Sequence, residues 1–280
     1  MSEITRQIRL DIAYKGVNYH GWQRYYDLPT IQGKIETALE KIVGRKEDGL
    51  QIWTTGSSRT DAGVHAINQV ATFNIESTIP AERFAYALNA KLPHDIRVRQ
   101  STEVALDFHP IKDCVRKKYC YLISDSQILL PFFHNYVWDW RSGQLNDEVM
   151  HEAAQMLVGE HDFISFQSCG SPRLTTVRTI FNISVQRKEF PIPFGVAFPG
   201  VTSPLIVIEV EGSGFLYHMV RAIAGTLADV GKKFTIDDAK EHIQSVLDAK
   251  NRSAAGMTAP AIGLYLVSIE FRQSTELERI

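Results

Sequence analysis

One loop in the first half of the chain holds three side chains that could take part in chemistry. The segment from Thr54 to Ala66 reads TTGSSRTDAGVHA, and it places Arg59, Asp61 and His65 between two strand-like stretches. Glycine, serine and aspartate are common in turns, but this connection is longer than the usual two to five residues of a hairpin. Because an arginine and a histidine add nothing to a turn, we interpret the loop as a functional site.

Asp61 is the candidate catalytic group of this loop. An aspartate in contact with water is ionised at pH 7 and needs no separate base to act as a nucleophile. When a substrate covers it, the loss of water favours the neutral acid, and a neighbouring guanidinium opposes that change. Arg59 points the same way as Asp61 only if the loop is extended. Arg221 lies on an expected helix among apolar residues, and its pattern fits a buried partner of Asp61 and a solvent-exposed helix charge equally well.

His65 has two interpretations. A histidine four residues after a carboxylate can act as a general base. We expect it instead to have a structural role, in which a hydrogen bond from its ring holds the loop.

Composition limits the class of protein. The chain has 280 residues and 44% hydrophobic residues, which is enough for one large domain or two smaller ones. Its three cysteines include no CxxC pair, so we expect neither a disulfide framework nor a structural zinc site, and a reducing, cytoplasmic location. The first residues are charged, and no stretch is long and apolar enough for a membrane span.

Net charge gives no support to a globally basic nucleic-acid-binding protein, because it is −2 with a pI near 6.5. Basic residues could still gather on one face. The candidate clusters are Arg116 to Lys118, Arg173 with Arg178, Arg187 with Lys188, and Lys232 with Lys233. Taken singly, each cluster is typical of a solvated surface.

The order of expected elements in the first half is β-α-β-β-α-β, which is the ferredoxin-like order of an antiparallel sheet with helices on one face. Periodicity and turn residues predict these elements at residues 8–14, 30–44, 50–55, 68–76, 81–92 and 96–104. Thr30 and Gly44 are expected to cap the first helix.

The second half resembles the first in outline. Helices are expected at 146–159, 215–231 and from a cap at Thr235, among strands that end with 263–271. Both halves place an aromatic residue and a histidine after a strand and a glycine, YKGVNYHGW and EGSGFLYHM, which we interpret as a weak internal repeat. We therefore predict an α+β chain of two ferredoxin-like (RRM-like) halves, 1–110 and 111–280, with a linker at 124–131 and an insertion loop at 190–204.

Five ordered motifs resemble the tRNA pseudouridine synthase A family. They are YxGxxYHGWQ, GxxRTDAGVHA, KKYCY, GSGFLYHMVR and GLYL, and they run from Ile8 to Phe271. The resemblance implies that the two halves join into a pseudouridine-synthase fold, with helices on one side and an RNA cleft on the other. It also implies an isomerase without a cofactor or metal, which breaks the glycosidic bond of a uridine, reorients the uracil and rejoins C5 to the ribose.

The resemblance implies a role for each matching residue. Asp61 is the catalytic aspartate, and its attack on the ribose C1′ and on the base C6 remain equally open. Tyr119 stacks on the target base and helps to remove the C5 proton, although its strand position alone would make it a core aromatic. Arg59 fills the gap left by the flipped nucleotide, and Arg221 pairs with Asp61. Leu264 packs beside the target base.

The implied substrate is the anticodon arm of transfer RNA at positions 38, 39 and 40. The family acts as homodimers, in which one subunit grips the elbow of the tRNA while the other does the chemistry. Reading shape through phosphate and sugar contacts suits dispersed cations, and we expect Lys118, Arg173 and Arg178 in the RNA cleft.

One position departs from the family pattern, since Ser58 stands where glycine usually precedes the Arg-Thr-Asp. If the backbone there needs a positive φ, the serine costs roughly 1 kcal/mol or more.

Two other functions remain open from sequence. A non-catalytic RNA-binding module on the same scaffold would have no use for Asp61. A hydrolase could use Asp61 as general base with His65, and would release a free product.

Overall fold

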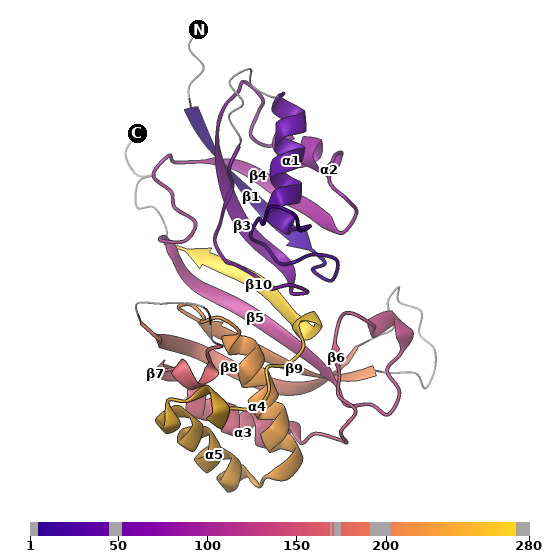
Figure 1. Cartoon of the computed structure of the whole chain (residues 1–280), viewed down its shortest axis with the longest axis vertical. Coiled ribbons are helices and arrows are strands. Elements are labelled where there is room, and N and C mark those ends of the chain that lie inside the picture. Colours follow the sequence, from indigo (N-terminus) through magenta and orange to yellow (C-terminus); the bar gives the residue numbers. More distant parts are fainter. Residues whose placement is uncertain (1–4, 45–51, 169, 171–174, 191–202, 273–280) are drawn as a thin grey trace. The chain divides into compact units, whose positions relative to one another are not determined.

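The computed structural model describes residues 5–44, 52–168, 170, 175–190 and 203–272 (Figure 1). These residues form two compact units, one within Met1–Lys117 and Leu266–Ile280 and the other within Lys118–Tyr265. The division falls inside the strand that begins at Cys114, whereas the sequence predicted a linker at 124–131. Within the described residues no helix combines the length and the hydropathy needed to cross a bilayer.

The first unit has the expected order of elements. They are β1 (Thr5–Tyr14), α1 (Ile31–Val43), β2 (Thr55–Gly56), β3 (His65–Glu76), α2 (Arg83–Asn89) and β4 (Ile96–Val104). β1 pairs antiparallel with β3 and with β4, and β10 (Leu264–Phe271), most of which belongs to this unit, follows β3 in the sheet. The predicted α+β class with an antiparallel sheet is confirmed.

Alternation on β1 and helical spacing on α1 build the core of this unit. Ile8, Leu10 and Ile12 are fully buried on alternate positions of β1, and Ile35 and Leu39 are fully buried one turn apart on α1. A buried side chain of this size contributes about 1.5 to 3 kcal/mol relative to leaving it in water. Because this packing of α1 on the sheet holds the strands in place, it also fixes the points at which the loops at the strand ends begin.

The predicted caps of α1 are confirmed. The Thr30 hydroxyl accepts a hydrogen bond from the Gly33 N–H at 3.3 Å, and Gly44 ends the helix with φ of 75°. The second predicted strand is much shorter than expected, because only Thr55–Gly56 pairs with β3. β3 in turn begins at His65 rather than Asn68, so the loop that carries Asp61 is limited to the residues from Ser57 to Val64.

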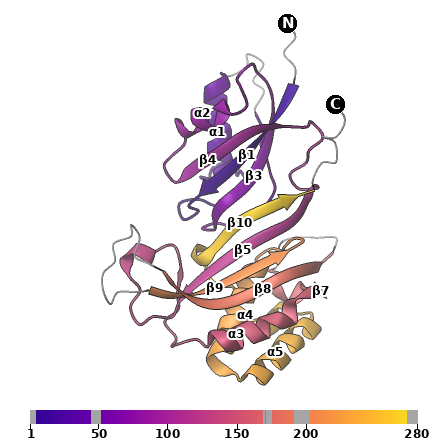
Figure 2. The same ribbon diagram turned by 180° about the vertical axis from the view of Figure 1, so that it is seen from behind.

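The second unit is a sheet with helices gathered on one side, as Figures 1 and 2 both show. Its elements are β5 (Cys114–Ser124), which belongs to this unit from Lys118 onward, β6 (Trp138–Asp139), α3 (Asp147–Ala154), β7 (Gly159–Asp162), β8 (Val177–Phe190), β9 (Ser203–Gly212), α4 (Met219–Lys233) and α5 (Ile236–Ala249). The strands follow the order β5-β9-β8-β7, and β6 pairs in parallel with β5. The expected insertion loop lies mostly in 191–202, outside the described residues.

Two predicted helices differ from the structure at their ends. The helix expected from Asn146 is capped by that residue as predicted, but it ends at Ala154 and continues as a 3₁₀ turn, Gln155–Leu157, before Gly159 takes φ of 107°. The helix expected from Phe215 begins only at Met219, because His218 has φ of 63°, a left-handed conformation that no α-helix contains.

Candidate active site

The loop that carries Asp61 is fixed to β3 at its first two residues. The Ser57 N–H donates to the Val70 carbonyl at 2.8 Å. The fully buried side chain of Gln69 accepts from the Ser58 N–H at 3.2 Å and donates to the Ser58 carbonyl at 2.6 Å. Both polar groups of the Ser58 backbone therefore have partners although the strand pairing has ended.

Ser58 carries no backbone strain. It is buried, and it is not among the non-glycine residues with a positive φ, which within the described ranges are Asn135, His218 and Lys250. The condition under which serine would be costly at this position is therefore not met.

Thr60 anchors the loop next to Asp61. Its hydroxyl and that of Tyr14 are 2.8 Å apart in a buried hydrogen bond, and its carbonyl accepts from the Trp22 N–H at 3.0 Å. Thr60 is buried, whereas Arg59 before it is exposed and Asp61 after it is partly exposed. The Thr60 contacts therefore hold the backbone between Arg59 and Asp61 in place.

The segment from Gly16 to Trp22, which we call the cradle, lies in close contact with the loop. A Cβ on Gly16 would stand 1.9 Å from the Val64 carbonyl oxygen, and a Cβ on Gly21 would stand 2.5 Å from that of Thr60. Gly21 also has φ of 89°, which favours glycine. The backbones of the YxGxxYHGWQ and RTDAGVHA motifs are therefore in direct contact.

His65 has the structural role that we expected. It is 2% exposed, and its Nδ1 accepts a hydrogen bond from the Gly16 N–H at 3.3 Å. An imidazole buried in this way holds the cradle to the start of β3. This position disfavours the hydrolase hypothesis, which needs His65 as a general base at the surface.

Lys117 is a contact that sequence reasoning missed. Its Nζ donates to the Ser57 carbonyl at 2.8 Å, so it fixes the start of the loop. The sequence favoured its neighbour Lys118 because the KKYCY motif does not show which lysine faces which side. Adjacent side chains of a strand point to opposite faces, so Lys117 and Lys118 could not both face the same surroundings. This alternation was the signal in the sequence that the two lysines have different roles.

In the second unit, Arg221 is tied to the segment that precedes β10. Its Nε donates to the Ala259 carbonyl at 2.8 Å, and the Ala259 N–H donates to the Arg221 carbonyl at 3.1 Å. The Tyr121 hydroxyl donates to the Pro260 carbonyl at 2.7 Å. Burial raises the pKa of Tyr121, and the nearby positive charge of Arg221 partly offsets this rise in the pKa. Arg221 is half-buried and hydrogen-bonded, so the interpretation as a solvent-exposed helix charge is wrong.

Close backbone contact also holds this segment on α4. A Cβ on Gly225 would stand 1.8 Å from the Met257 carbonyl oxygen. Gly256 donates its N–H to the Thr226 hydroxyl at 2.9 Å. The segment before β10 is therefore held on α4 at Gly256 and Met257 as well as at Ala259.

Tyr119 and Leu264 are both buried in the second unit. The Tyr119 ring meets the Phe215 ring edge-on, with centroids 5.2 Å apart and planes at 86°. Such a contact fixes the orientation of the Tyr119 ring.

The expected RNA-binding cations are in different surroundings. Lys118 Nζ lies 3.1 Å from a Glu209 oxygen and 3.4 Å from a Glu211 oxygen; burial lowers its pKa, but these two carboxylates outweigh it and raise the pKa. Arg178 donates to the carbonyls of Thr175 and Val177 at 3.1 and 2.6 Å. Arg173 lies outside the described residues.

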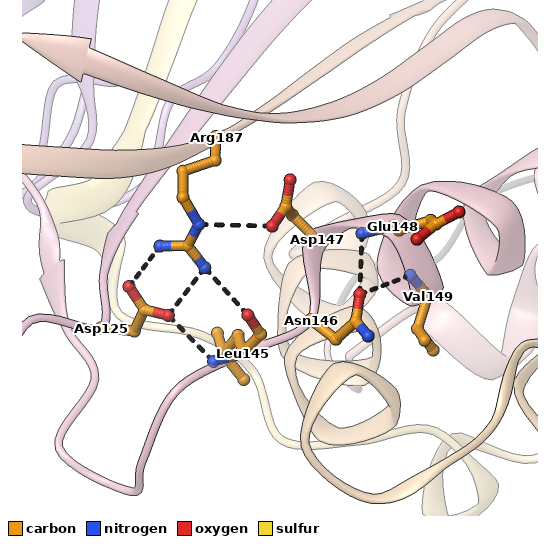
Figure 3. A network of polar contacts seen from close by, with 7 residues as sticks. All are labelled: Asp125, Leu145, Asn146, Asp147, Glu148, Val149 and Arg187. Atoms are coloured by element: carbon orange, nitrogen blue, oxygen red, sulfur yellow. Dashed lines mark hydrogen bonds and ion pairs between the residues drawn. The ribbon is translucent and has the colours of Figure 1, made fainter.

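Arg187, from another expected basic cluster, belongs to a structural network (Figure 3). Its guanidinium donates to both Asp125 oxygens at 2.7 and 2.9 Å and to the Leu145 carbonyl at 2.8 Å, and it pairs with Asp147 at 3.3 Å. Burial opposes ionisation of Asp125, but hydrogen bonds from Arg187 and the Leu145 N–H outweigh it and lower its pKa. This network fixes the start of α3 and uses the Arg187 guanidinium within the protein.

Comparison with known proteins identifies the family. A family model described as tRNA pseudouridine synthase matches residues 12–111 and 153–272, which is more than half of the chain. The chain belongs to the tRNA pseudouridine synthase family. Pseudouridine synthases are isomerases, and the first matched region contains the cradle and the Asp61 loop, while the second contains Arg221 and Leu264.

Relatives in this family match over almost their whole length. Proteins named tRNA pseudouridine synthase A are 43% identical in Ruminiclostridium cellulolyticum, 41% in Acetivibrio thermocellus and 39% in Thermoanaerobacter sp. strain X514. The alignments cover 94 to 95% of this chain and 99 to 100% of those proteins. A solved Cbf5-Nop10-Gar1 complex matches with a TM-score of 0.30 and 11% identity, over 93% of this chain and 58% of that chain, which is too distant to bear on the site.

The predicted site residues are shared between the two units of this pseudouridine synthase. Arg59 and Asp61 lie together on one loop of the first unit. Lys118, Tyr119, Arg178, Arg221 and Leu264 belong to the second unit. The pairing of Asp61 with Arg221 stays a prediction. Among the described residues, no group of three or more His, Cys, Asp or Glu side chains is arranged to hold a metal ion.

Proposed function

We propose that this protein converts uridine to pseudouridine in the anticodon stem-loop of transfer RNA, at positions 38, 39 and 40, with Asp61 as the catalytic residue. The observation that carries the proposal is the geometry around Asp61 in a member of this family. The nearby residues Thr60 and Val64 are held by backbone contacts, while Asp61 itself is partly exposed. A carboxylate held in this way needs little rearrangement to meet a substrate.

The reaction is balanced without a cofactor. The Asp61 carboxylate attacks either the ribose C1′ or the base C6, the bond between N1 and C1′ breaks, and the uracil turns within the pocket. C5 then bonds to C1′, the C5 proton leaves, N1 gains a proton and the carboxylate is released. Substrate and product are isomers, so the reaction consumes no water, oxidant or reductant.

The other site residues take the supporting roles. Extruding a nucleotide from a stem costs a few kcal/mol, and the flipped base needs a stacking surface and an occupant for the gap. Tyr119, oriented by Phe215, provides the stacking surface and accepts the C5 proton, and Leu264 packs beside the base. Arg59, exposed on the loop, fills the gap, and Arg221 pairs with Asp61.

The tRNA is held by dispersed cations of a homodimer, which grips the anticodon arm and the elbow. Lys118, Arg173 and Arg178 are the proposed phosphate contacts, and at Lys118 a phosphate has to compete with Glu209 and Glu211. In this arrangement the 1–110 half carries the catalytic loop and the 111–280 half completes the cleft. The proposed location is the cytoplasm, where tRNA is modified.

Release of tritium from tRNA labelled at uridine C5 tests the proposal, because isomerisation expels that hydrogen without breaking the chain. We expect release by the wild-type protein and a fall of at least about 1,000-fold for Asp61→Asn, which is the scale on which loss of a nucleophile acts. Replacing each uridine at 38, 39 and 40 by cytidine in turn assigns the release to positions.

The same assay separates the other two hypotheses. A non-catalytic RNA-binding module would bind tRNA and release no tritium, and Asp61→Asn would leave its binding role intact. A hydrolase would yield free uracil. Release that persists in Asp61→Asn would refute the role of Asp61, and no release from the wild type would refute the isomerase activity.

A further inference from the structure

A short loop next to the cradle presents two tyrosines to solvent. The segment of residues 23–29, which we call the tyrosine loop, carries Tyr26 fully exposed and Tyr25 56% exposed. Leu28 pairs with Tyr25 in a β-bridge across the tip. Large aromatic side chains usually bury most of their surface, so two adjacent exposed rings on one loop need an explanation.

The tyrosine loop is held in place at its base. The His20 N–H donates to the Pro29 carbonyl at 2.9 Å, and the N–H groups of Ile31 and Gln32 donate to the carbonyls of Gly21 and Trp22 at 3.1 and 3.0 Å. These bonds close the loop between the cradle and the start of α1. A surface fixed in this way loses little conformational entropy when a ligand binds it.

A buried carboxylate also braces the loop. Glu36, fully buried on α1, accepts from Arg24 Nη1 at 3.0 Å and from the Thr54 N–H at 2.9 Å. Gln32 donates to Glu36 and accepts from the Arg24 N–H at 3.0 Å. Because Thr54 leads into β2, one network connects the tyrosine loop to the strand that begins the Asp61 loop.

The tyrosine loop also lies close to the catalytic loop. The Trp22 N–H donates to the carbonyl of Thr60, the residue before Asp61. Tyr26 follows Trp22 by four residues, so the two Cα atoms are at most about 14 Å apart. A strand of a nucleic-acid duplex advances about 3.4 Å per nucleotide, so about four nucleotides span that distance.

The size and chemistry of this surface fit bases better than a protein. Two aromatic side chains bury about 150 to 250 Å² each when covered, whereas each partner in a standard protein interface buries about 800 Å². Unpaired RNA bases, in contrast, stack singly on tyrosine rings. The surface therefore has the area that one or two bases require.

We propose that the tyrosine loop binds the RNA substrate by stacking an unpaired base, a few nucleotides from the reacting uridine, on Tyr26, with Tyr25 supporting it. This inference rests on the proposed function, because it takes the substrate to be a tRNA stem-loop. The occupant is a base of the loop or of its junction with the stem, since paired bases inside a helix do not offer a free face.

Steady-state kinetics of tritium release test the inference. For Tyr26→Ala we expect KM to rise about 5- to 100-fold, the range expected for one lost base stack, while kcat stays within twofold. Tyr26→Phe and Tyr26→Trp keep a stacking ring and should keep the wild-type KM. Tyr86→Ala removes another exposed tyrosine of the first unit, on α2, and serves as the matched control with unchanged kinetics.

Binding measurements separate this inference from the proposed function. The Kd for tRNA is measured in the Asp61→Asn background with and without Tyr26→Ala, and we expect the same 5- to 100-fold loss. If the wild type releases no tritium but Tyr26→Ala weakens binding, the proposed function fails and the stacking site stands. If the wild type is active and Tyr26→Ala changes neither KM nor Kd, the stacking site is refuted while the function stands.

Two further outcomes would overturn the inference. A rise in KM for Tyr26→Phe equal to that for Tyr26→Ala would show that the hydroxyl, not the ring, makes the contact. A change in sedimentation coefficient of the RNA-free protein on Tyr26→Ala would show that Tyr26 contacts a second copy of the chain.

Discussion

A tyrosine-histidine motif occurs near each candidate site region, in the cradle that contacts the Asp61 loop and directly before the helix of Arg221. The two regions are held in place differently. In the first, Tyr19-His20-Gly21 ends with a left-handed glycine whose Cβ position is 2.5 Å from the Thr60 carbonyl oxygen. In the second, Tyr217-His218-Met219 places the positive φ on His218, whose Nδ1 is hydrogen-bonded to the Ser168 hydroxyl at 2.9 Å.

The difference shows two ways to fix a site residue. The first unit brings backbone against backbone, which needs glycine, while Arg59 stays exposed and Asp61 partly exposed. The second unit uses its own site residue as a clamp, because Arg221 bonds to Ala259. For the proposed roles, this means that the Asp61 loop is positioned through its backbone, whereas Arg221 uses one of its five donors on the Ala259 carbonyl.

The largest expected effect is at Gly225, where the second unit also relies on backbone contact. A Cβ there would stand 1.8 Å from the Met257 carbonyl oxygen, so Gly225→Ala has to separate α4 from the segment before Ala259. We expect the free energy of unfolding to fall by about 4 kcal/mol or more. Urea unfolding measures it, with Gly214→Ala as control, because the atoms nearest to a Cβ there are 3.9 Å away. Equal stabilities for the two variants would contradict the role of close contact.

The second prediction concerns the ion pair between Arg187 and Asp125 in Figure 3, which stabilises the second unit through side chains rather than through close backbone contact at a glycine. Arg187→Met leaves the Asp125 carboxylate, 3% exposed, without its guanidinium, and we expect a loss of about 3 to 5 kcal/mol at pH 7. Lys188→Met is the matched control, because Lys188 is 43% exposed and 3.9 Å from Glu209, and it should cost less than about 0.5 kcal/mol.

This ion pair also predicts a pH dependence. The pKa of Asp125 is lowered in the folded protein, so its stabilising contribution is complete above the ordinary aspartate value of about 3.9 and is lost as pH falls through the lowered value. The stability difference between wild type and Arg187→Met should therefore shrink below about pH 4. Unfolding curves at pH 7 and at pH 3 measure it, and a constant difference would contradict the assignment.

The third prediction tests the backbone contact at the cradle. Gly21→Ala combines a positive φ with a clash against Thr60, and we expect a loss of about 2 to 4 kcal/mol in stability together with at least a tenfold fall in kcat. Gly143→Ala has φ of 103° with no atom within 4 Å, so it isolates the cost of the conformation, about 1 kcal/mol, and should leave kcat unchanged. If Gly21→Ala keeps full activity, as the control Gly143→Ala should, the cradle does not position Asp61.

The smallest effect is expected at Ser58. Because this residue has no positive φ, Ser58→Gly removes no strain and adds freedom to the unfolded chain. We expect a loss of about 0.5 to 1 kcal/mol, measured by thermal or urea unfolding. A gain in stability would show that a glycine is preferred there after all.

The elements that local sequence determines were predicted well. Thr30, Asn146 and Thr235 cap their helices, and β4 has the predicted bounds of Ile96 and Val104. The failures have non-local causes. Nothing local distinguishes His218 in a left-handed conformation from the first turn of a helix, and the length of β2 depends on its pairing with β3.

The roles of the site residues stay predictions, but the contacts around the Asp61 loop can be compared with the sequence. The Arg-Thr-Asp loop was found from residue type and spacing, and the structural role chosen for His65 agrees with its hydrogen bond from the Gly16 N–H. The hydrogen bonds of Thr60 to Tyr14, of Ser57 to Lys117 and of Ser58 to Gln69 join residues whose contact depends on strand register. Register is set by the whole sheet, so no short motif contains it.

The first unit is assembled from two stretches of chain, and this affects how it is made. Its last strand, Leu266–Phe271, leaves the ribosome only after the 118–265 segment has been translated. At 5 to 20 residues per second, that segment takes on the order of 10 s to synthesise. During this interval the edge of β3 is a template for strand addition, to which a chaperone or another nascent chain could bind before β10 arrives.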